Sequence, residues 1–129
     1  MNLDTPSSPV SASRHPVLEA IKFSPIATVV SDPTKSDNPI IAVNAAFCTL
    51  TGYSEAEVIG RNCRFLRGPD TENGQTEKLR SSIYGQRPAL AELINYRKDG
   101  SPFRNAVMIA PLFDDLGNLQ LFVGSQIEV

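Results

Sequence analysis

The chain has 129 residues, of which 41% are hydrophobic and 20% charged, and its formal net charge is −2. This length suits one domain, and the near-neutral charge argues against direct binding of nucleic acid. Two cysteines and one histidine are too few for a disulfide framework or a thiolate–imidazole metal cluster. No apolar run reaches the roughly 18 residues of a bilayer span, and no signal-peptide pattern is present. We therefore expect a cytoplasmic protein without a metal site or a membrane contact.

The first part of the chain is rich in Ser and Pro. Residues 1–13 have few large apolar side chains, so ordering them would cost more entropy than burial returns, and we expect a disordered tail. Residues 14–23 carry an apolar stripe at helical spacing, which predicts an N-terminal cap helix. The stripe consists of Val17, Leu18 and Ile21. The core domain is then expected to cover residues 24–129.

Two short strands and two short helices are predicted next. Residues 27–31 and 40–43 are apolar and mostly β-branched, as buried strands are. Residues 44–52 begin with an Asn that caps a helix and end with a Gly that terminates it. Residues 54–60 begin with a Ser-x-x-Glu capping box, which predicts a helix of one or two turns.

The second half of the chain combines a longer helix with three strands. The helix is predicted over about residues 72–84, with Thr71 as its cap and with Leu79 and Ile83 facing inward. Three further strands are predicted over residues 90–97, 103–112 and 119–127. The element order indicates an α+β fold, in which a five-stranded antiparallel sheet carries helices on one face.

The strand periodicity places three carboxamides among apolar neighbours, because residues two apart share a face of a sheet. They are Asn95, Asn105 and Gln126, one in each of the last three strands. A buried carboxamide costs free energy unless its donors and its acceptor are answered, so this convergence suggests a neutral ligand with a polar edge, such as a pyrimidine-like ring. Alternatively, each amide is bonded to the backbone or exposed at a strand end, and the pattern leaves both interpretations open.

Arginines and one cysteine suggest further chemistry. Arg64, Arg67 and Arg80 are candidates for a phosphate site, since a guanidinium pairs bidentately with phosphate oxygens, although arginines on helices are commonly only solvated. Cys63 lies among polar residues, where a core thiol would be out of place, whereas Cys48 has the apolar neighbours of an ordinary core thiol. Composition and spacing alone thus indicate a cytosolic ligand-binding module with one unusual cysteine.

Residues 60–71 read GRNCRFLRGPDT, which resembles the signature GRNCRFLQGPxT of the LOV family, the flavin-binding photoreceptor branch of the PAS domains. Only Arg67 departs from the defined positions, and the resemblance is collinear without a gap from about Pro25 to Val129. It implies a PAS fold whose sheet and short helices enclose a flavin pocket. The last strands look most like those of bacterial members that precede a helix-turn-helix or a histidine kinase.

The resemblance implies a blue-light receptor that binds FMN. Cys63 matches the cysteine whose sulfur bonds reversibly to flavin carbon C4a in light, while the ring nitrogen N5 takes its proton. Gln126 matches the amide that turns over when N5 becomes a donor, and Asn95 and Asn105 match the residues that read the pyrimidine edge with it. The remaining positions matched to cofactor contacts are Val29, Asn38, Ile40, Asn62, Arg64, Leu66, Arg67, Leu79, Arg80, Ile83, Val107, Ile109, Phe122 and Gly124.

Two positions depart from the usual family pattern. Arg64 and Arg80 match the arginines that hold the FMN phosphate, but Arg67 replaces a Gln. A cation close to the phosphate thus replaces a neutral hydrogen bond to the ribityl chain, and Arg67→Gln is expected to be tolerated because it restores the family residue. Val107 stands where plant members often have Phe, which removes aromatic volume beside the dimethylbenzene side of the ring.

Two other functions are weighed against this one. A light-inert PAS module for ligand binding or dimerisation is the first, and Cys63 argues against it. An enzyme is the second, but the single histidine, His15, lies near the tail and offers no Cys–His pair, so we expect no enzymatic activity.

The face of the sheet opposite the pocket is predicted to be apolar. It would carry Ala106, Met108, Ala110, Leu121, Val123 and Ile127, with Ile94 and Tyr96 extending it. Monomers seldom leave such a patch exposed, so we expect the N-terminal helix, a second copy of the chain or an output domain to cover it.

Overall fold

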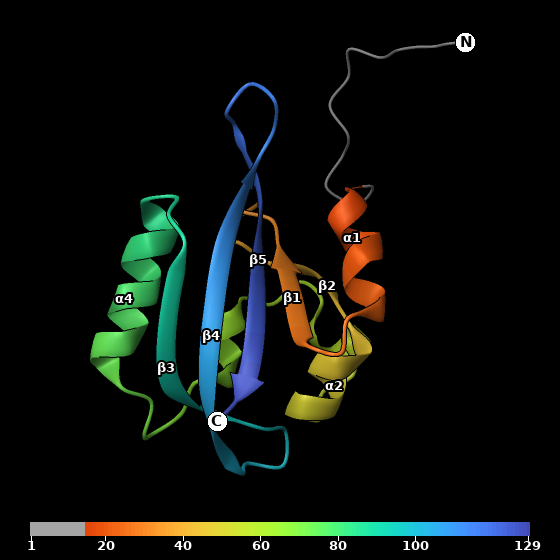
Figure 1. The fold of residues 1–129 in the computed structure, drawn as a ribbon. Helices are drawn as coiled ribbons and strands as arrows, with labels where there is room; N and C mark the ends of the chain where they lie inside the picture. The colour runs from red at the N-terminus through yellow and green to blue at the C-terminus, as the bar shows by residue number, and fades with distance from the viewer. Residues whose placement is uncertain (1–14) are drawn as a thin grey trace.

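A computed structural model describes residues 15–129, so the tail expected at residues 1–13 lies outside the described part of the chain. Its centre is a five-stranded antiparallel sheet with the strand order β2-β1-β5-β4-β3 (Figure 1). The strands are β1 (Ala27–Ser31), β2 (Ile40–Val43), β3 (Ala89–Tyr96), β4 (Pro102–Phe113) and β5 (Leu119–Glu128). The α+β class is confirmed, and each strand end lies within one residue of its predicted position.

Short helices precede the sheet and connect its second and third strands. They are α1 (Pro16–Ala20), η3 (Ile21–Phe23), α2 (Ala45–Thr51), α3 (Glu55–Val58), η4 (Cys63–Leu66) and α4 (Asn73–Tyr84). Gly52 ends α2 with a positive φ of 79°, a conformation that glycine adopts without steric cost. Both bonds of the capping box between Ser54 and Glu57 are present at the start of α3. None of the helices within residues 15–129 combines the length and apolar character that a membrane span requires.

The start of α4 differs from the prediction. The helix begins at Asn73, and Thr71 does not cap it. Instead, the Thr71 hydroxyl donates to the Ile94 carbonyl at 2.5 Å, while the Glu72 carboxylate accepts from the Ile94 amide at 2.9 Å. Because β3 is an edge strand, its outward backbone groups need partners, and these two side chains supply them.

Helices pack on the inner face of the sheet, as predicted, and the N-terminal helix lies on the outer face. On the inner face, Val29 and Ile40 pack with Phe47 of α2 and Val58 of α3, while Leu79 of α4 packs against β3 and β4. On the outer face lies α1, whose docking buries a separate cluster. That cluster contains Ile21, Val30 and Leu121, with Val17 and Leu18 partly buried against it. The N-terminal helix is therefore one of the expected covers of the outer face.

The rest of the outer face stays open. Leu90, Met108 and Ile127 are 58%, 53% and 48% exposed. Tyr96 does not extend this patch as predicted, because its hydroxyl accepts a hydrogen bond from the Asp70 amide at 2.9 Å. The exposed part thus follows β3, β4 and the end of β5.

One buried side chain joins the outer helix to the inner layer. The Asn44 amide oxygen accepts from the backbone amides of Thr28 in β1 and Phe47 in α2, both at 3.0 Å. Its nitrogen donates to the carbonyls of Ile21 at 2.9 Å and Ile26 at 2.8 Å. Asn44 therefore both caps α2, as predicted, and fixes the N-terminal segment to the sheet.

Candidate functional site

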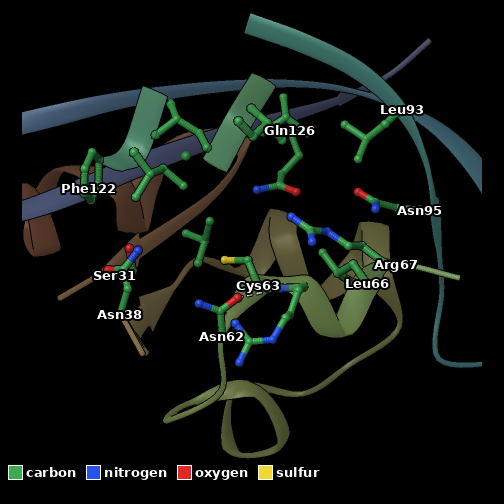
Figure 2. Close-up of a pocket in the computed structure, with 17 residues that line it drawn as sticks. Ser31, Asn38, Asn62, Cys63, Leu66, Arg67, Leu93, Asn95, Phe122 and Gln126 are labelled. Carbon is green, nitrogen blue, oxygen red and sulfur yellow. Dashed lines mark hydrogen bonds between the residues drawn. The ribbon is translucent and has the colours of Figure 1, made fainter. Parts of the chain in front are cut away.

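A cavity lies between the inner face of the sheet and the helical segments η4 and α4 (Figure 2). Most of the predicted contact residues line it: Val29, Asn38, Asn62, Cys63, Arg64, Leu66, Arg67, Leu79, Ile83, Asn95, Val107, Ile109, Phe122, Gly124 and Gln126. Two further lining residues, Ser31 and Leu93, were not predicted. Each lies two positions along its strand from a predicted residue, so the same face periodicity could have found them.

Three predicted residues do not line this cavity. Ile40 is fully buried in the core with the helices α2 and α3. Asn105 is also fully buried, and it is hydrogen-bonded to Asn95 and Gln126, which do line the cavity. Arg80 lines a groove that adjoins the cavity. The structure thus places Ile40 in the core, Asn105 next to two amides that line the cavity, and Arg80 in the adjoining groove.

The three carboxamides converge as their strand positions predict. Asn105 Nδ2 donates to Asn95 Oδ1 at 2.9 Å and to Gln126 Oε1 at 3.0 Å, and all three side chains are buried. Asn105 Oδ1 is buried and has no hydrogen-bond partner within residues 15–129. The amides therefore do not sit exposed at strand ends. A ligand with an N–H donor on a flat polar edge would answer the free acceptor.

The turn that carries Cys63 is held from the loop before β2. The Asn62 side chain accepts from the Arg64 amide at 3.0 Å and donates to the Asp37 carbonyl at 2.7 Å. The Arg64 guanidinium forms an ion pair with the Asp37 carboxylate through both of its terminal nitrogens. Asp37 and Asn38 have φ values of 67° and 49°, in the left-handed region that Asp and Asn tolerate. Both neighbours of Cys63 are thus anchored to one loop.

Cys63 points its sulfur into the cavity (Figure 2). Desolvation raises the pKa of the thiol to about 11, although the nearby Arg67 cation partly opposes this rise. Cys48, by contrast, packs against the core cluster of α2 and α3, as predicted. Cys63 therefore offers a neutral thiol at neutral pH, unlike the thiolate of a cysteine hydrolase.

A groove at the mouth of the cavity gathers four cations. Lys35, Arg64, Arg67 and Arg80 line it, together with the carboxylates of Asp37 and Glu77. The groove measures about 600 Å³. Lys35 was not predicted, because it lies in a turn-rich connection with no local signal of its own. This cluster of positive charge suits an anionic group such as a phosphate.

Gly124 lies where two strands approach each other closely. A Cβ at this position would come within 3.1 Å of Val29 Cγ1, its neighbour on β1. Packing between the strands therefore gives a reason for this glycine that does not depend on a ligand.

Comparison with known proteins identifies the family. The model of the PAS domain family matches residues 25–129. A blue-light-activated histidine kinase from Erythrobacter litoralis is 47% identical over 112 residues, which are 87% of this chain and 31% of the kinase. The solved LOV domain of the Erythrobacter litoralis EL346 blue-light-activated histidine kinase is 39% identical with a TM-score of 0.79, over 82% of this chain and 97% of that one. The chain is a LOV domain of the PAS family.

A second solved light-oxygen-voltage domain, studied with a flavin analogue, matches this LOV domain with a TM-score of 0.85 and 42% identity. That alignment covers 92% of this chain and 88% of the other. The LOV domain spans only about a third of the length of the Erythrobacter histidine kinase, 31%. The match therefore covers only a part of that relative.

The residues in and around the cavity suit a flavin. The unpaired acceptor on Asn105 suits a ring N–H, and apolar side chains such as Leu79 and Ile109 suit the flat faces of the ring. Asn38 Oδ1 is a second buried acceptor without a partner within residues 15–129, and it lies between the cavity and the cationic groove. A polyhydroxyl chain that ends in a phosphate could donate to Asn38 through a hydroxyl and bind the cationic groove through its phosphate.

Proposed function

We propose that this LOV domain binds FMN in the cavity and responds to blue light through a reversible bond between Cys63 and the flavin. The observation that carries the proposal is the position of Cys63, which faces the cavity that Asn95 and Gln126 also line, with Asn105 hydrogen-bonded to both amides. When bound, FMN supplies blue-light absorption and a ring carbon, C4a, that accepts the sulfur while the adjacent N5 takes the thiol proton.

The protein's own residues supply placement. The anchored turn keeps the Cys63 thiol close to one point of the cavity, which gives it an effective concentration that no free thiol reaches. Asn95 and Asn105 read the polar edge of the ring. Gln126 carries both a donor and an acceptor. Its amide nitrogen can donate to N5 before this atom gains a proton, and after the amide turns over its oxygen can accept from the protonated N5.

An absorption spectrum recorded in the dark and then in blue light tests the proposal. The purified domain is expected to be yellow, to bleach in blue light and to recover in darkness. Cys63→Ala should stay yellow and lose the bleaching, whereas the matched control Cys48→Ala should bleach like the wild type.

Three outcomes would count against the proposal. Reversible bleaching in Cys63→Ala would mean that another residue bonds to the flavin. A protein that stays colourless after FMN is supplied would remove the flavin itself. A yellow protein that never bleaches would favour the light-inert PAS module.

We further propose that the domain acts as a switch in the cytoplasm and turns over no substrate. Its partner would be an output domain, either a histidine kinase or a helix-turn-helix, or a second copy of the chain, docked on the open part of the outer face. The blue-light-activated histidine kinase among its relatives supports such an output. The exposed Leu90, Met108 and Ile127 support the site of docking.

A further inference from the structure

Arg67 lies at both compartments of the site, the cavity and the groove at its mouth. It lines the cavity that contains Cys63 and also the groove with the other cations. In Figure 2 its side chain extends between the turn that carries Cys63 and the amides of Asn95 and Gln126. Rotation about its own side-chain bonds can therefore carry its guanidinium between the cavity and the mouth.

The arginines around the groove differ in what already binds them. Arg64 is paired through two nitrogens with Asp37. Arg80 is paired with both carboxylate oxygens of Glu77, at 2.8 and 2.6 Å. Within residues 15–129, the Arg67 guanidinium forms no hydrogen bond and no ion pair. All five of its N–H donors therefore remain free for an anion.

The charges near Arg67 also favour an anion. Partial burial and repulsion from Arg64 and Arg80 lower its pKa, and within residues 15–129 no carboxylate forms an ion pair with it. A guanidinium stays protonated in proteins, so the unfavourable repulsion is not relieved by loss of the proton. A bound anion would relieve it. A phosphate dianion in the groove would replace this repulsion with attraction.

We propose that Arg67 is the main residue by which this LOV domain selects a flavin with a terminal phosphate over one without it. This inference rests on the proposed function, since it concerns the same cofactor. It also revises the expectation that Arg67→Gln is tolerated. The cavity measures about 100 Å³ with the Arg67 side chain on its lining, so a turn of this side chain toward the groove would make room for the ring.

Flavin exchange measures this selectivity. Wild type, Arg67→Gln, Arg67→Lys and Arg80→Gln are titrated with FMN and with riboflavin, and the ratio of the two dissociation constants is compared. Arg67→Gln is expected to weaken FMN roughly ten- to hundredfold, the range for one lost charge-assisted contact, and to leave riboflavin within about twofold. Arg67→Lys should restore part of the ratio, and Arg80→Gln should lower it less than Arg67→Gln.

Arg61→Gln serves as the matched control, because Arg61 lies on the same segment, stacks on Phe65 and lines neither compartment. It should keep the wild-type ratio. Equal losses of FMN and riboflavin in Arg67→Gln, or a larger loss of the ratio in Arg80→Gln, would overturn the proposal. Failure of the wild type to bind either flavin would instead contradict the proposed function.

Discussion

At the scale of single residues, the environment of Cys63 limits the chemistry that it can perform. The thiol is desolvated, and the nearby Arg67 cation offsets the resulting rise in its pKa only in part. A nucleophilic hydrolase needs a lowered thiol pKa, whereas a thiol that gives its proton to a neighbouring ring atom needs only proximity. The raised pKa of Cys63 therefore fits the proposed switch and disfavours a thiolate enzyme.

The protonation of Cys63 can be tested by its rate of alkylation. Because its pKa is raised from 9.0 to about 11, the thiol stays protonated through pH 9 and ionises only above pH 10. In a Cys48→Ala background, the rate of reaction with iodoacetamide in the dark should stay low up to pH 10 and then rise. A half-maximal rate at pH 9 or below would contradict this assignment.

At the scale of one element, β5 connects the cavity to the outer face. Its inner face presents Phe122, Gly124 and Gln126, and the next residue, Ile127, is 48% exposed on the other side. Gln126 pairs with Val107 on β4 and with Ala27 on β1. We therefore expect a turn of the Gln126 amide to affect the neighbouring strands β1 and β4 and any partner docked on the outer face.

The substitution Gln126→Leu tests whether the bond between Cys63 and the flavin can form without the light-dependent change in β5. The variant keeps the side chain's approximate volume but has no amide to turn. It should still bleach in blue light, yet lose the light-dependent change in amide exchange of β5. Ser125→Ala, on the outer face of the same strand, should keep that change. A full light response in Gln126→Leu would remove Gln126 from the route.

At the scale of the whole molecule, the sheet separates two packing layers. Ile21 is 6% exposed and belongs to the outer cluster under α1, while the cavity lies on the inner face. Ile21→Ala should lower the free energy of unfolding by roughly 2–4 kcal/mol, the usual cost of such a truncation. FMN binding and bleaching should stay close to wild type.

Urea unfolding and the dark and lit spectra measure these two effects. Phe23→Ala is the matched control, since Phe23 is 88% exposed and its loss should change stability by less than about 0.5 kcal/mol. Loss of flavin in Ile21→Ala at temperatures where the protein stays folded would show that the two layers are coupled.

The sequence by itself determined the features that depend on neighbours along the chain. The cap at Asn44 and the box of Ser54 and Glu57 follow from residues within one helical turn. The inner-facing amides follow from the two-residue period of strands, and the proposed flavin site follows from the motif around Cys63. These features need no knowledge of how distant segments meet.

Only the tertiary structure decided which distant groups become partners. The pairing of Asp37 with Arg64 joins residues 27 positions apart, and Lys35 reaches the same groove from a loop without a local signal. The Thr71 hydroxyl donates to the Ile94 carbonyl because this carbonyl points outward from an edge strand and needs a hydrogen-bond donor. Hydrogen bonds and charges act through space, between residues that can be distant in sequence. Only the structure therefore shows that Arg64 and Arg80 have carboxylate partners while the Arg67 guanidinium has none within residues 15–129.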